Sequence, residues 1–583
     1  MKFVKHLLAL AIALCALPSM LKAQAVNVVA VGGGSSALFL ELGQGAVSGT
    51  GTGATNTPCV WTSKKNSNIV ARDNRPFVAT GSSVDEQGNF WVTWNQGNGV
   101  GATCADPLHG TSTINVNVYS YMQLDSTVGD KCFFEGDGPS ATGCQQVLTV
   151  ALPAAGANLL TGFTDTSLPS VIESAVNGKH FTYAGTDIRP EDAKFATYRM
   201  FQPCGQVTYR NPYDLGYRLT YGLGYSGAHT GIGLQVHSAF SSSVFNVLDF
   251  AINGGPDPIT GNPTPPSFAV STVGAQPIVV AVAPASDTAG IAGASDINGF
   301  TLSLFYEGIL ARSTDLMGPS TTNPVVTLVR EPLSGTYNTF EYSMPNSSQF
   351  HTSQDDNFCN GSAVYNTTMN IGSGTGAEPG AVRARVIGTG EMVSTLQAAT
   401  SDSLGYFFWS AANANGASNL KYLTVNGVDP LLDSYGSSGG LTYTQGALPQ
   451  ASPGAGVPPL TAVSFKNLNA GDYPIWSAIR IVSAPSDPAV AALLTSLGPI
   501  NSTQHDYITL ANLKVWHSHF PIYAIVGNWA NGTTINPATP NDLCTGGSAE
   551  AGGDAGGTNV LKQVNADFCS DYGNPLGLTN KTN

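Results

Sequence analysis

The segment 325–343 constrains the fold most, because a strand-like run is followed there by a short loop and a helix-like run. Residues 325–329 (VVTLV) are mostly β-branched and apolar, and the run ends at Arg330. Residues 334–336 (SGT) then open a stretch with helical spacing of its apolar residues. A strand that leads through a loop into a helix presents unpaired backbone N–H groups and the positive end of the helix dipole. A strand, loop and helix in this order can hold an anion at the helix N-terminus.

The side chains of this loop suit a tetrahedral anion. Gly335 allows the backbone to approach a ligand closely, and Ser334 and Thr336 add hydroxyl donors. Arg330 can offer a planar fork of donors to an oxyanion. The alternative is an ordinary helix with Ser334 as N-cap beside a surface arginine. This segment alone leaves both interpretations open.

Other segments match a known family in the same order. The motif Arg330-x-x-x-Ser334-Gly335-Thr336 resembles the anion-binding segment of the periplasmic phosphate-binding proteins of ABC transporters and of the related DING family. Residues 32–38 (GGGSSAL), directly after the strand-like run 26–31, resemble the N-terminal glycine-rich loop of that family, and residues 181–187 (FTYAGTD) resemble its aspartate segment. Residues 302–316, 390–409 and 473–475 are similar to its second-lobe helices and return strand.

The resemblance implies an α/β, two-lobed type II periplasmic-binding-protein fold in which one anion lies between the lobes. Arg330 would neutralise the charge of the anion, and Asp187 would accept a hydrogen bond from a protonated phosphate oxygen. Because sulfate has no such proton at neutral pH, Asp187 would discriminate against it. The ligand-binding residues that the resemblance implies are Ser36, Ala37, Ser167 and Asp187 in lobe one and Arg330, Ser334, Gly335 and Thr336 in lobe two.

Three positions match the family pattern less simply than the others. Ser167 lies in a polar Thr-Asp-Thr-Ser stretch and corresponds to a serine loop of the family. Asp187 precedes Ile-Arg-Pro, so it could instead cap a helix over 190–198. Glu331, beside Arg330, departs from the family pattern and bears on how tightly phosphate would bind.

The composition excludes some classes of partner. Only 11% of the 583 residues are charged, against about 25% in an average domain, while 42% are hydrophobic, which is enough for real cores. The 67 glycines and 35 prolines indicate a loop-rich exported protein with much β structure. A net charge of −14 without any basic run disfavours nucleic-acid binding. An acidic chain can still bind an anion, because local donors make the site.

The first 25 residues have the pattern of a signal peptide. Lys2, Lys5 and His6 are followed by the apolar run 7–17 and by the small-x-small site 23–25. That apolar run is too short for a spanning helix, and no later segment approaches one. The sequence therefore predicts a periplasmic or secreted protein that does not span a membrane.

Eight cysteines follow this predicted leader, and an even number in an exported chain indicates disulfides. Their spacing favours Cys132–Cys144 and Cys544–Cys569 as local bridges. The other pairings stay open, since eight cysteines allow about 105 connectivities. A metal site is disfavoured by the lack of any C-x-x-C motif.

The order of these segments divides the chain. Residues 276–283 (QPIVVAVA) have the pattern of a fully buried strand and resemble a first hinge strand, with 473–482 as the return. The predicted units are a signal peptide (1–25), the first part of lobe one (26–284) with inserts at 58–150 and 199–270, lobe two (285–470), and a return to lobe one with a disulfide-containing C-terminal extension (471–583).

Three short motifs formally match other functions. Residues 222–227 (GLGYSG) fit a dinucleotide-binding pattern but lack a βαβ context, and 436–440 (GSSGG) fit an esterase pattern without a strand-to-helix frame. His517 and His519 lack a third metal ligand. We therefore expect no cofactor, no metal and no catalytic residue.

The sequence thus predicts an exported solute-binding protein that captures inorganic phosphate, or a related tetrahedral oxyanion, for uptake through an ABC-type permease. Two alternatives remain open. One is a structural or surface-interaction protein that uses the fold as a scaffold for its inserts, which the low charge and the Gly/Thr segments favour. The other is a secreted phosphatase of the DING type, which would require a metal cluster or an activated nucleophile.

Overall fold

In the computed structural model, the described residues are most of 26–193, 268–343, 382–433 and 443–521, with short strands at 234–236, 368–370, 568–570 and 579–580. The predicted leader, most of the insert 199–270, most of the C-terminal extension, Glu331, the motifs 222–227 and 436–440, and His517 lie outside the described residues. Of the competing motifs, only the backbone of His519 is described, in the strand Ser518–Pro521.

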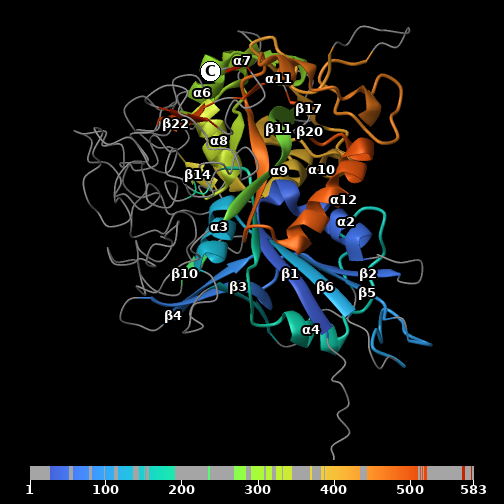
Figure 1. Cartoon of the computed structure of the whole chain (residues 1–583). Coiled ribbons are helices and arrows are strands. Elements are labelled where there is room, and N and C mark those ends of the chain that lie inside the picture. The colour runs from blue at the N-terminus through green and yellow to red at the C-terminus, as the bar shows by residue number, and fades with distance from the viewer. Residues whose placement is uncertain are drawn as a thin grey trace, which may run out of the picture.

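One thirteen-stranded mixed sheet runs through both lobes (Figure 1). Its strands, in spatial order, are β14 (Thr368–Asn370), β15 (Val382–Val386), β13 (Val326–Arg330), β16 (Ser403–Phe408), β11 (Ala269–Ala283), β19 (Trp476–Ser483), β9 (Tyr183–Thr186), β1 (Val26–Gly34), β6 (Val116–Gln123), β5 (Phe90–Asn95) and β2 (Pro58–Ser63). The two short strands β17 (Lys421–Tyr422) and β20 (Ile508–Thr509) also pair with β11.

The long strand β11 joins the two lobes. Its residues 269–277 pair with β19, which in turn pairs with β9 of lobe one, whereas its residues 278–283 pair with β16 of lobe two. The chain returns along the segment that enters β19, where Ile278 N donates to Ile475 O at 2.8 Å. Two crossing segments between two α/β lobes are the type II periplasmic-binding-protein architecture that the sequence predicts.

Lobe one has a parallel centre in which β1 pairs with both β6 and β9. Each face of this sheet has its own core: Val118 of β6 belongs to one buried cluster, and Tyr119 and Tyr121 belong to another. Helices α2 (Phe39–Thr50) and α12 (Pro488–Gln504) cover the sheet face that carries Tyr121. Helices α3 (Ser126–Glu135) and α4 (Ser170–Val176) cover the opposite face. Both faces of this sheet are therefore covered, as is usual for parallel strands.

The range 58–150 differs from the predicted insert. Its β2 and β5 extend the main sheet, and its β6 and α3 are part of lobe one itself. Its three other strands, β4 (Ser82–Gln87), β3 (Ile69–Phe77) and β7 (Cys144–Leu148), join β10 (Leu234–Val236) and β8 (Lys179–His180) in a five-stranded sheet with the order β10-β4-β3-β7-β8.

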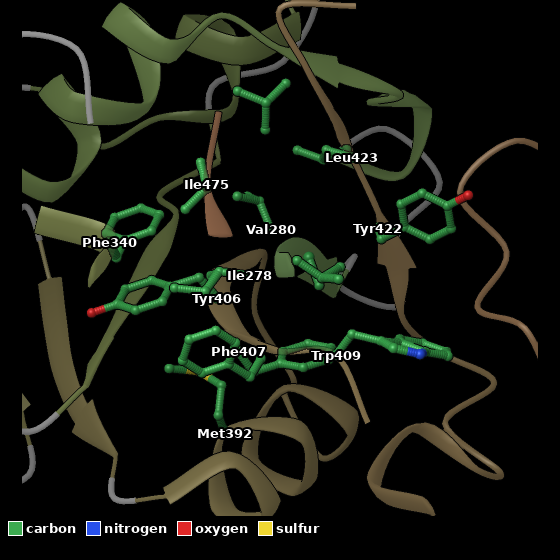
Figure 2. Packing of buried hydrophobic residues seen from close by; sticks show 14 of the residues in the cluster. Ile278, Val280, Phe340, Met392, Tyr406, Phe407, Trp409, Tyr422, Leu423 and Ile475 are labelled. Atoms are coloured by element: carbon green, nitrogen blue, oxygen red, sulfur yellow. The ribbon is translucent and has the colours of Figure 1, made fainter. Parts of the chain in front are cut away.

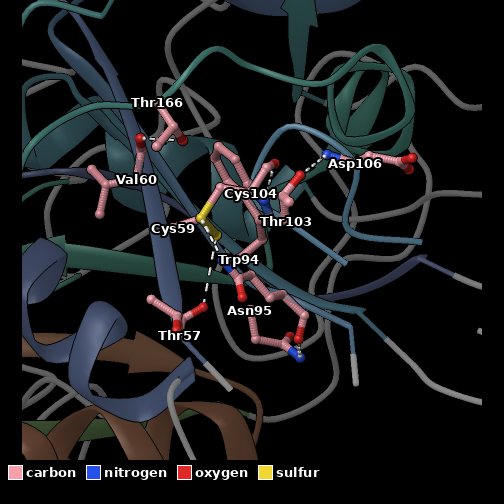
Figure 3. The surroundings of a disulfide bond; sticks show 10 residues. Thr57, Cys59, Val60, Trp94, Asn95, Thr103, Cys104, Asp106 and Thr166 are labelled. Atoms are coloured by element: carbon pink, nitrogen blue, oxygen red, sulfur yellow. Dashed lines mark hydrogen bonds between the residues drawn. A yellow bond between two sulfur atoms is a disulfide. The ribbon is translucent and has the colours of Figure 1, made fainter. Parts of the chain in front are cut away.

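Two disulfides join described residues of lobe one. Cys132–Cys144, which the sequence predicts, ties α3 to β7. Cys59–Cys104 ties β2 to the loop after β5, beside Trp94 (Figure 3). The first bond therefore fixes the five-stranded sheet to α3, and the second holds the edge of the main sheet. The other four cysteines that follow the predicted leader, Cys204, Cys359, Cys544 and Cys569, include the other predicted bridge, and the pairing of these four stays a prediction.

Lobe two is built around β13, which runs parallel to β15 and β16. Phe340 stacks on Tyr406 with ring centroids 3.8 Å apart, in a core that includes Ile278, Val280 and Trp409 (Figure 2). Its helices are α6 (Gly299–Glu307), α7 (Ser313–Met317), α8 (Gly335–Ser343), α9 (Gly388–Gln397), α10 (Ala411–Ala414) and α11 (Lys466–Ala470). Short elements complete the described structure, namely η1 (Ser36–Leu38), η4 (Ile291–Gly293), η5 (Leu460–Ala462), β12 (Asp296–Ile297), β18 (Thr424–Val425), β21 (Val515–Trp516), β22 (Ser518–Pro521), β23 (Phe568–Ser570) and β24 (Thr579–Asn580).

None of the helices in the described part of the chain combines the length and the apolar character needed to cross a membrane.

Candidate functional site

The candidate site lies where the carboxyl ends of parallel strands from both lobes meet. In lobe one, β1, β9 and β6 are parallel, and the loops that follow them carry Ser36, Asp187 and Ser126. In lobe two, β13 and β15 are parallel, so the end of β13 at Arg330 lies beside the end of β15. The crevice outside the carboxyl ends of the strands is where open α/β sheets bind ligands.

Asp187 is the residue on which both lobes converge, and it is only 1% exposed. Its Oδ1 accepts a hydrogen bond from Ser126 Oγ at the start of α3, and its Oδ2 accepts one from Thr336 Oγ1 of α8 at 3.2 Å. Its backbone carbonyl accepts a bond from Ser477 Oγ of β19 at 2.7 Å. Both carboxylate oxygens are therefore held by hydroxyls of other elements, which the interpretation as a plain helix cap does not require.

The electrostatics of Asp187 are balanced between opposing effects. Burial raises the pKa of the Asp187 carboxyl, while the hydrogen bond from Ser126, the charge of Arg330 and the hydrogen bond from Thr336 lower it, with a net rise. A carboxylate that is costly to bury gains free energy from any further donor that reaches it. A ligand that brings its own proton would supply such a donor.

Arg330 ends β13 and is buried, with 1% of its surface exposed, so the interpretation as a surface arginine is wrong. Its Nη2 donates to Ser334 Oγ at 3.0 Å. The same Ser334 Oγ accepts the backbone N–H of Thr336 at 3.1 Å and thus caps α8. Capping and ligand contact are compatible here, because a hydroxyl that accepts two bonds still has a proton to donate.

Gly335 allows the lobes to approach each other. A Cβ on Gly335 would overlap Asp187 Oδ1 and would come within 2.8 Å of Ser126 Oγ. The backbone of lobe two also bonds directly to lobe one nearby, where Thr127 N donates to Leu333 O at 3.2 Å. The lobes therefore approach each other closely at the predicted glycine.

Ser36 and Ala37 form the turn η1 after β1. Ser36 Oγ accepts the backbone N–H of Thr389 at 3.2 Å and lies 3.2 Å from Thr389 Oγ1, at the start of α9 in lobe two. The backbone N–H of Ala37 donates to Ser35 Oγ at 3.1 Å. Tyr121 fixes this turn, because its hydroxyl donates to Ser35 O at 2.9 Å.

Ser167 is the predicted residue that the structure does not bring to the others. It is exposed and follows Thr166, whose N–H donates to Val60 O at 2.8 Å at the edge strand β2. The other seven predicted residues lie at the end of β13 or in loops and helix starts at the junction of the lobes.

Sequence reasoning missed Ser126 and Thr389. Ser126 follows a strand-like run and opens a helix, as Ser334 does. It lies within the predicted insert 58–150, outside the predicted anion site. Thr389 follows β15, and the expected helix was started one residue later, at Gly390.

The arrangement offers a cationic guanidinium, several hydroxyls, the N-termini of α3 and α8, and one acceptor, all buried. Among the described residues, no group of three or more acidic, histidine or cysteine side chains could hold a metal ion. The chemistry that these groups can perform is the binding of an oxyanion that carries a proton.

Comparisons with known proteins give similarity of structure only. No protein-family model and no curated protein matches this chain. A phosphate-binding protein from Stenotrophomonas maltophilia matches at 14% identity and a TM-score of 0.30, over 75% of this chain and 92% of the other. An ABC-type phosphate transport receptor from Vibrio cholerae matches at 14% identity and a TM-score of 0.24, over 42% of this chain and 73% of the other.

A phosphate ABC transporter substrate-binding protein with bound phosphate from Clostridium perfringens matches at 12% identity and a TM-score of 0.25, over 42% of this chain and 72% of the other. Similarity of this degree carries no argument about a ligand. The ligand therefore has to be inferred from the side chains of the site.

Proposed function

We propose that this chain is an exported solute-binding protein that captures inorganic phosphate, or a related tetrahedral oxyanion, between its two lobes. One observation carries the proposal: buried Arg330 and buried Asp187, from different lobes, are linked through Ser334 and Thr336 at the start of α8. Ser126 at the start of α3 holds the other carboxylate oxygen of Asp187. The ligand would be bound and released unchanged, and an ABC-type permease would be its recipient.

The chemistry of these groups favours phosphate over other anions. Arg330 supplies a positive charge and a fork of donors, and helix N-termini supply backbone N–H groups. Asp187 is an acceptor, so it selects an anion that still holds a proton at neutral pH. Sulfate would meet Asp187 with unrelieved repulsion, whereas phosphate and arsenate would donate to it.

The disulfides support export to an oxidising compartment. Cys59–Cys104 and Cys132–Cys144 are bonds that persist in periplasmic and secreted proteins and are rare in the cytosol. Together with the predicted leader, they favour a periplasmic or secreted location.

Calorimetric titration of the mature chain with phosphate, arsenate and sulfate tests the proposal. We expect phosphate and arsenate to bind with a stoichiometry of one per chain and sulfate to bind far more weakly. Absence of phosphate binding would overturn it. Incubation with a phosphate monoester separates binding from the phosphatase alternative, because steady release of phosphate that is lost in Arg330→Ala would identify an enzyme.

A further inference from the structure

A second pair of buried acids lies at the junction of the lobes, apart from the candidate anion site. Glu41 is in the first turn of α2, which follows directly on Ser36 and η1. Asp506 follows His505, the C-cap residue of α12. Glu41 is 1% exposed and Asp506 is 0% exposed. Two acids in such positions need a specific compensation for their burial.

Asp506 connects this pair to lobe two. Its Oδ1 accepts the backbone N–H of Ala411, the first residue of α10, at 2.6 Å. Its own backbone N–H donates to Asn501 Oδ1 at 2.9 Å, which fixes Asp506 to α12. α12 packs on α2 of lobe one (Figure 1). The bond to Ala411 N of lobe two therefore makes the Asp506 carboxyl a bridge between the lobes.

The carboxyl groups of Glu41 and Asp506 lie next to each other. Within the described part of the chain, both oxygens of Glu41 and Oδ2 of Asp506 have no hydrogen-bond partner. Two ionised carboxylates have only acceptors, so a bond between them requires a proton on one of them. One shared proton would satisfy these buried oxygens, as in other carboxyl pairs that share a buried site.

We propose that Glu41 and Asp506 share one proton and that this shared proton keeps the two lobes closed. While the proton is present, Glu41 donates to Asp506, and the charge of Asp506 is directed at the N-terminus of α10. When the proton is lost, two adjacent buried negative charges repel each other, and opening of the lobes relieves the repulsion by admitting water.

The pair is placed where it can act on the anion site. α10 packs against α9, whose residue Thr389 bonds to Ser36, and Ser36 lies directly before the helix that carries Glu41. The segment around Asp506 also spans the crossing between the lobes, since Trp409 Nε1 donates to His505 O at 2.9 Å and β20 pairs with β11. Loss of the proton would therefore loosen both the crossing and the Ser36 contact.

The surrounding groups agree with a shared proton. Burial, followed by the charge of Asp506, raises the pKa of the Glu41 carboxyl well above its ordinary range, and burial also raises the pKa of Asp506. The other titratable groups that face the pair are Tyr507 and Tyr121, and burial raises the pKa of both phenols, so neither supplies a positive charge. A pKa that is higher in the closed form stabilises that form at low pH and ceases to do so as the pH rises through it.

Two measurements on the ligand-free protein test the proposal. In the infrared spectrum at neutral pH, we expect a carboxylic-acid C=O band that Glu41→Gln removes. In small-angle X-ray scattering from about pH 5 to about pH 9, we expect the wild type to expand as the pH rises through the raised pKa of the pair. Glu41→Gln should stay compact throughout, because its amide donates to Asp506 at every pH.

Matched variants keep the test decisive. Asp472→Asn removes an exposed carboxyl and should leave both the band and the expansion unchanged. Asp506→Asn, whose amide can donate to Glu41, should suppress the expansion and serves if Glu41→Gln does not fold. An unchanged acid band in Glu41→Gln, or a wild type that does not expand with pH, would overturn the proposal. Because no ligand is present, neither outcome depends on whether the chain binds phosphate.

Discussion

The two halves of the candidate site are built in different ways. Lobe two contributes a contiguous segment, from Arg330 to Thr336, in which strand, loop and helix follow one another. Lobe one contributes single residues, namely Ser36, Ser126 and Asp187, from three loops that are far apart in the chain. A contiguous half can be recognised from a short motif, whereas a dispersed half requires the strand order. We therefore expect a substitution in the lobe-two segment to disturb that whole half of the site. A substitution in one lobe-one loop should affect only the contact that this loop contributes.

The largest effect is expected at Arg330. Arg330→Ala removes a charge-assisted fork in which each bond contributes about 1.5–3 kcal/mol, so phosphate binding should be lost by at least about tenfold per bond. Calorimetric titration measures the loss. Lys466→Ala is the control, because Lys466 is a cation that is 64% exposed and lies outside the site. Equal affinities of wild type and Arg330→Ala would remove Arg330 from the site.

Gly335→Ala should have the next largest effect. Its Cβ would overlap Asp187 Oδ1, so the lobes could close only with a shift that costs about 1–3 kcal/mol. We expect weaker phosphate binding, measured by calorimetry, with little change in the thermal stability of the separate lobes. Gly498→Ala is the matched control, since a Cβ at that helical position meets no atom within 4 Å. If both variants bind phosphate like the wild type, the approach at Gly335 is not needed for binding.

The two halves also differ in how far the sequence could predict them. In lobe two, Arg330 and Ser334 lie four residues apart, and their 3.0 Å bond follows from one turn of chain. In lobe one, the contact between Ser126 and Asp187 depends on β6 and β9 both flanking β1. The apolar pattern of β6 is visible in the sequence, but its neighbours in the sheet are not, because pairing of parallel strands is set by long-range packing.

The acid pair was beyond sequence reasoning for the same reason. Glu41 lies in an apolar helix and Asp506 in a loop at the far end of the chain, and nothing local indicates that they meet. The hinge strand β11 was predictable, since its apolar run is longer than a half-buried strand requires. A single acidic residue in an apolar stretch of sequence therefore indicates a function only once the structure shows which residue it contacts.

Asp187→Asn tests the acceptor of lobe one. An amide can donate to a fully deprotonated oxygen, whereas a carboxylate cannot, so the ratio of phosphate to sulfate affinity should fall. Because burial raises the pKa of Asp187, its contribution to the stability of the closed form is present at low pH and lost as the pH rises through that pKa. Competition binding and thermal unfolding against pH measure the two effects. An unchanged phosphate-to-sulfate ratio would remove Asp187 from the site.

Ser126→Ala and Ser167→Ala compare the serine that the structure places at the site with the one that the resemblance implies. Ser126→Ala removes the donor to Asp187 Oδ1 and should weaken phosphate binding by about 1–2 kcal/mol, roughly tenfold. Ser167 is exposed and distant from the site, so Ser167→Ala should change nothing. The reverse pattern, measured by the same titration, would show that the lobe-one half is assembled differently.

The smallest effect is expected at Thr389, the link between lobe two and the first loop of lobe one. Thr389→Val keeps the shape of this fully buried side chain and removes the hydroxyl 3.2 Å from Ser36 Oγ, while the backbone N–H of residue 389 can still donate to Ser36. The loss should be about 0.5–1.5 kcal/mol, a few-fold in phosphate affinity. Thr495→Val is the control, because its hydroxyl bonds to Ala491 O on the exposed face of α12. An affinity loss as large as that of Arg330→Ala would mean that Thr389 binds the anion directly, and lobe two would then also be a dispersed half.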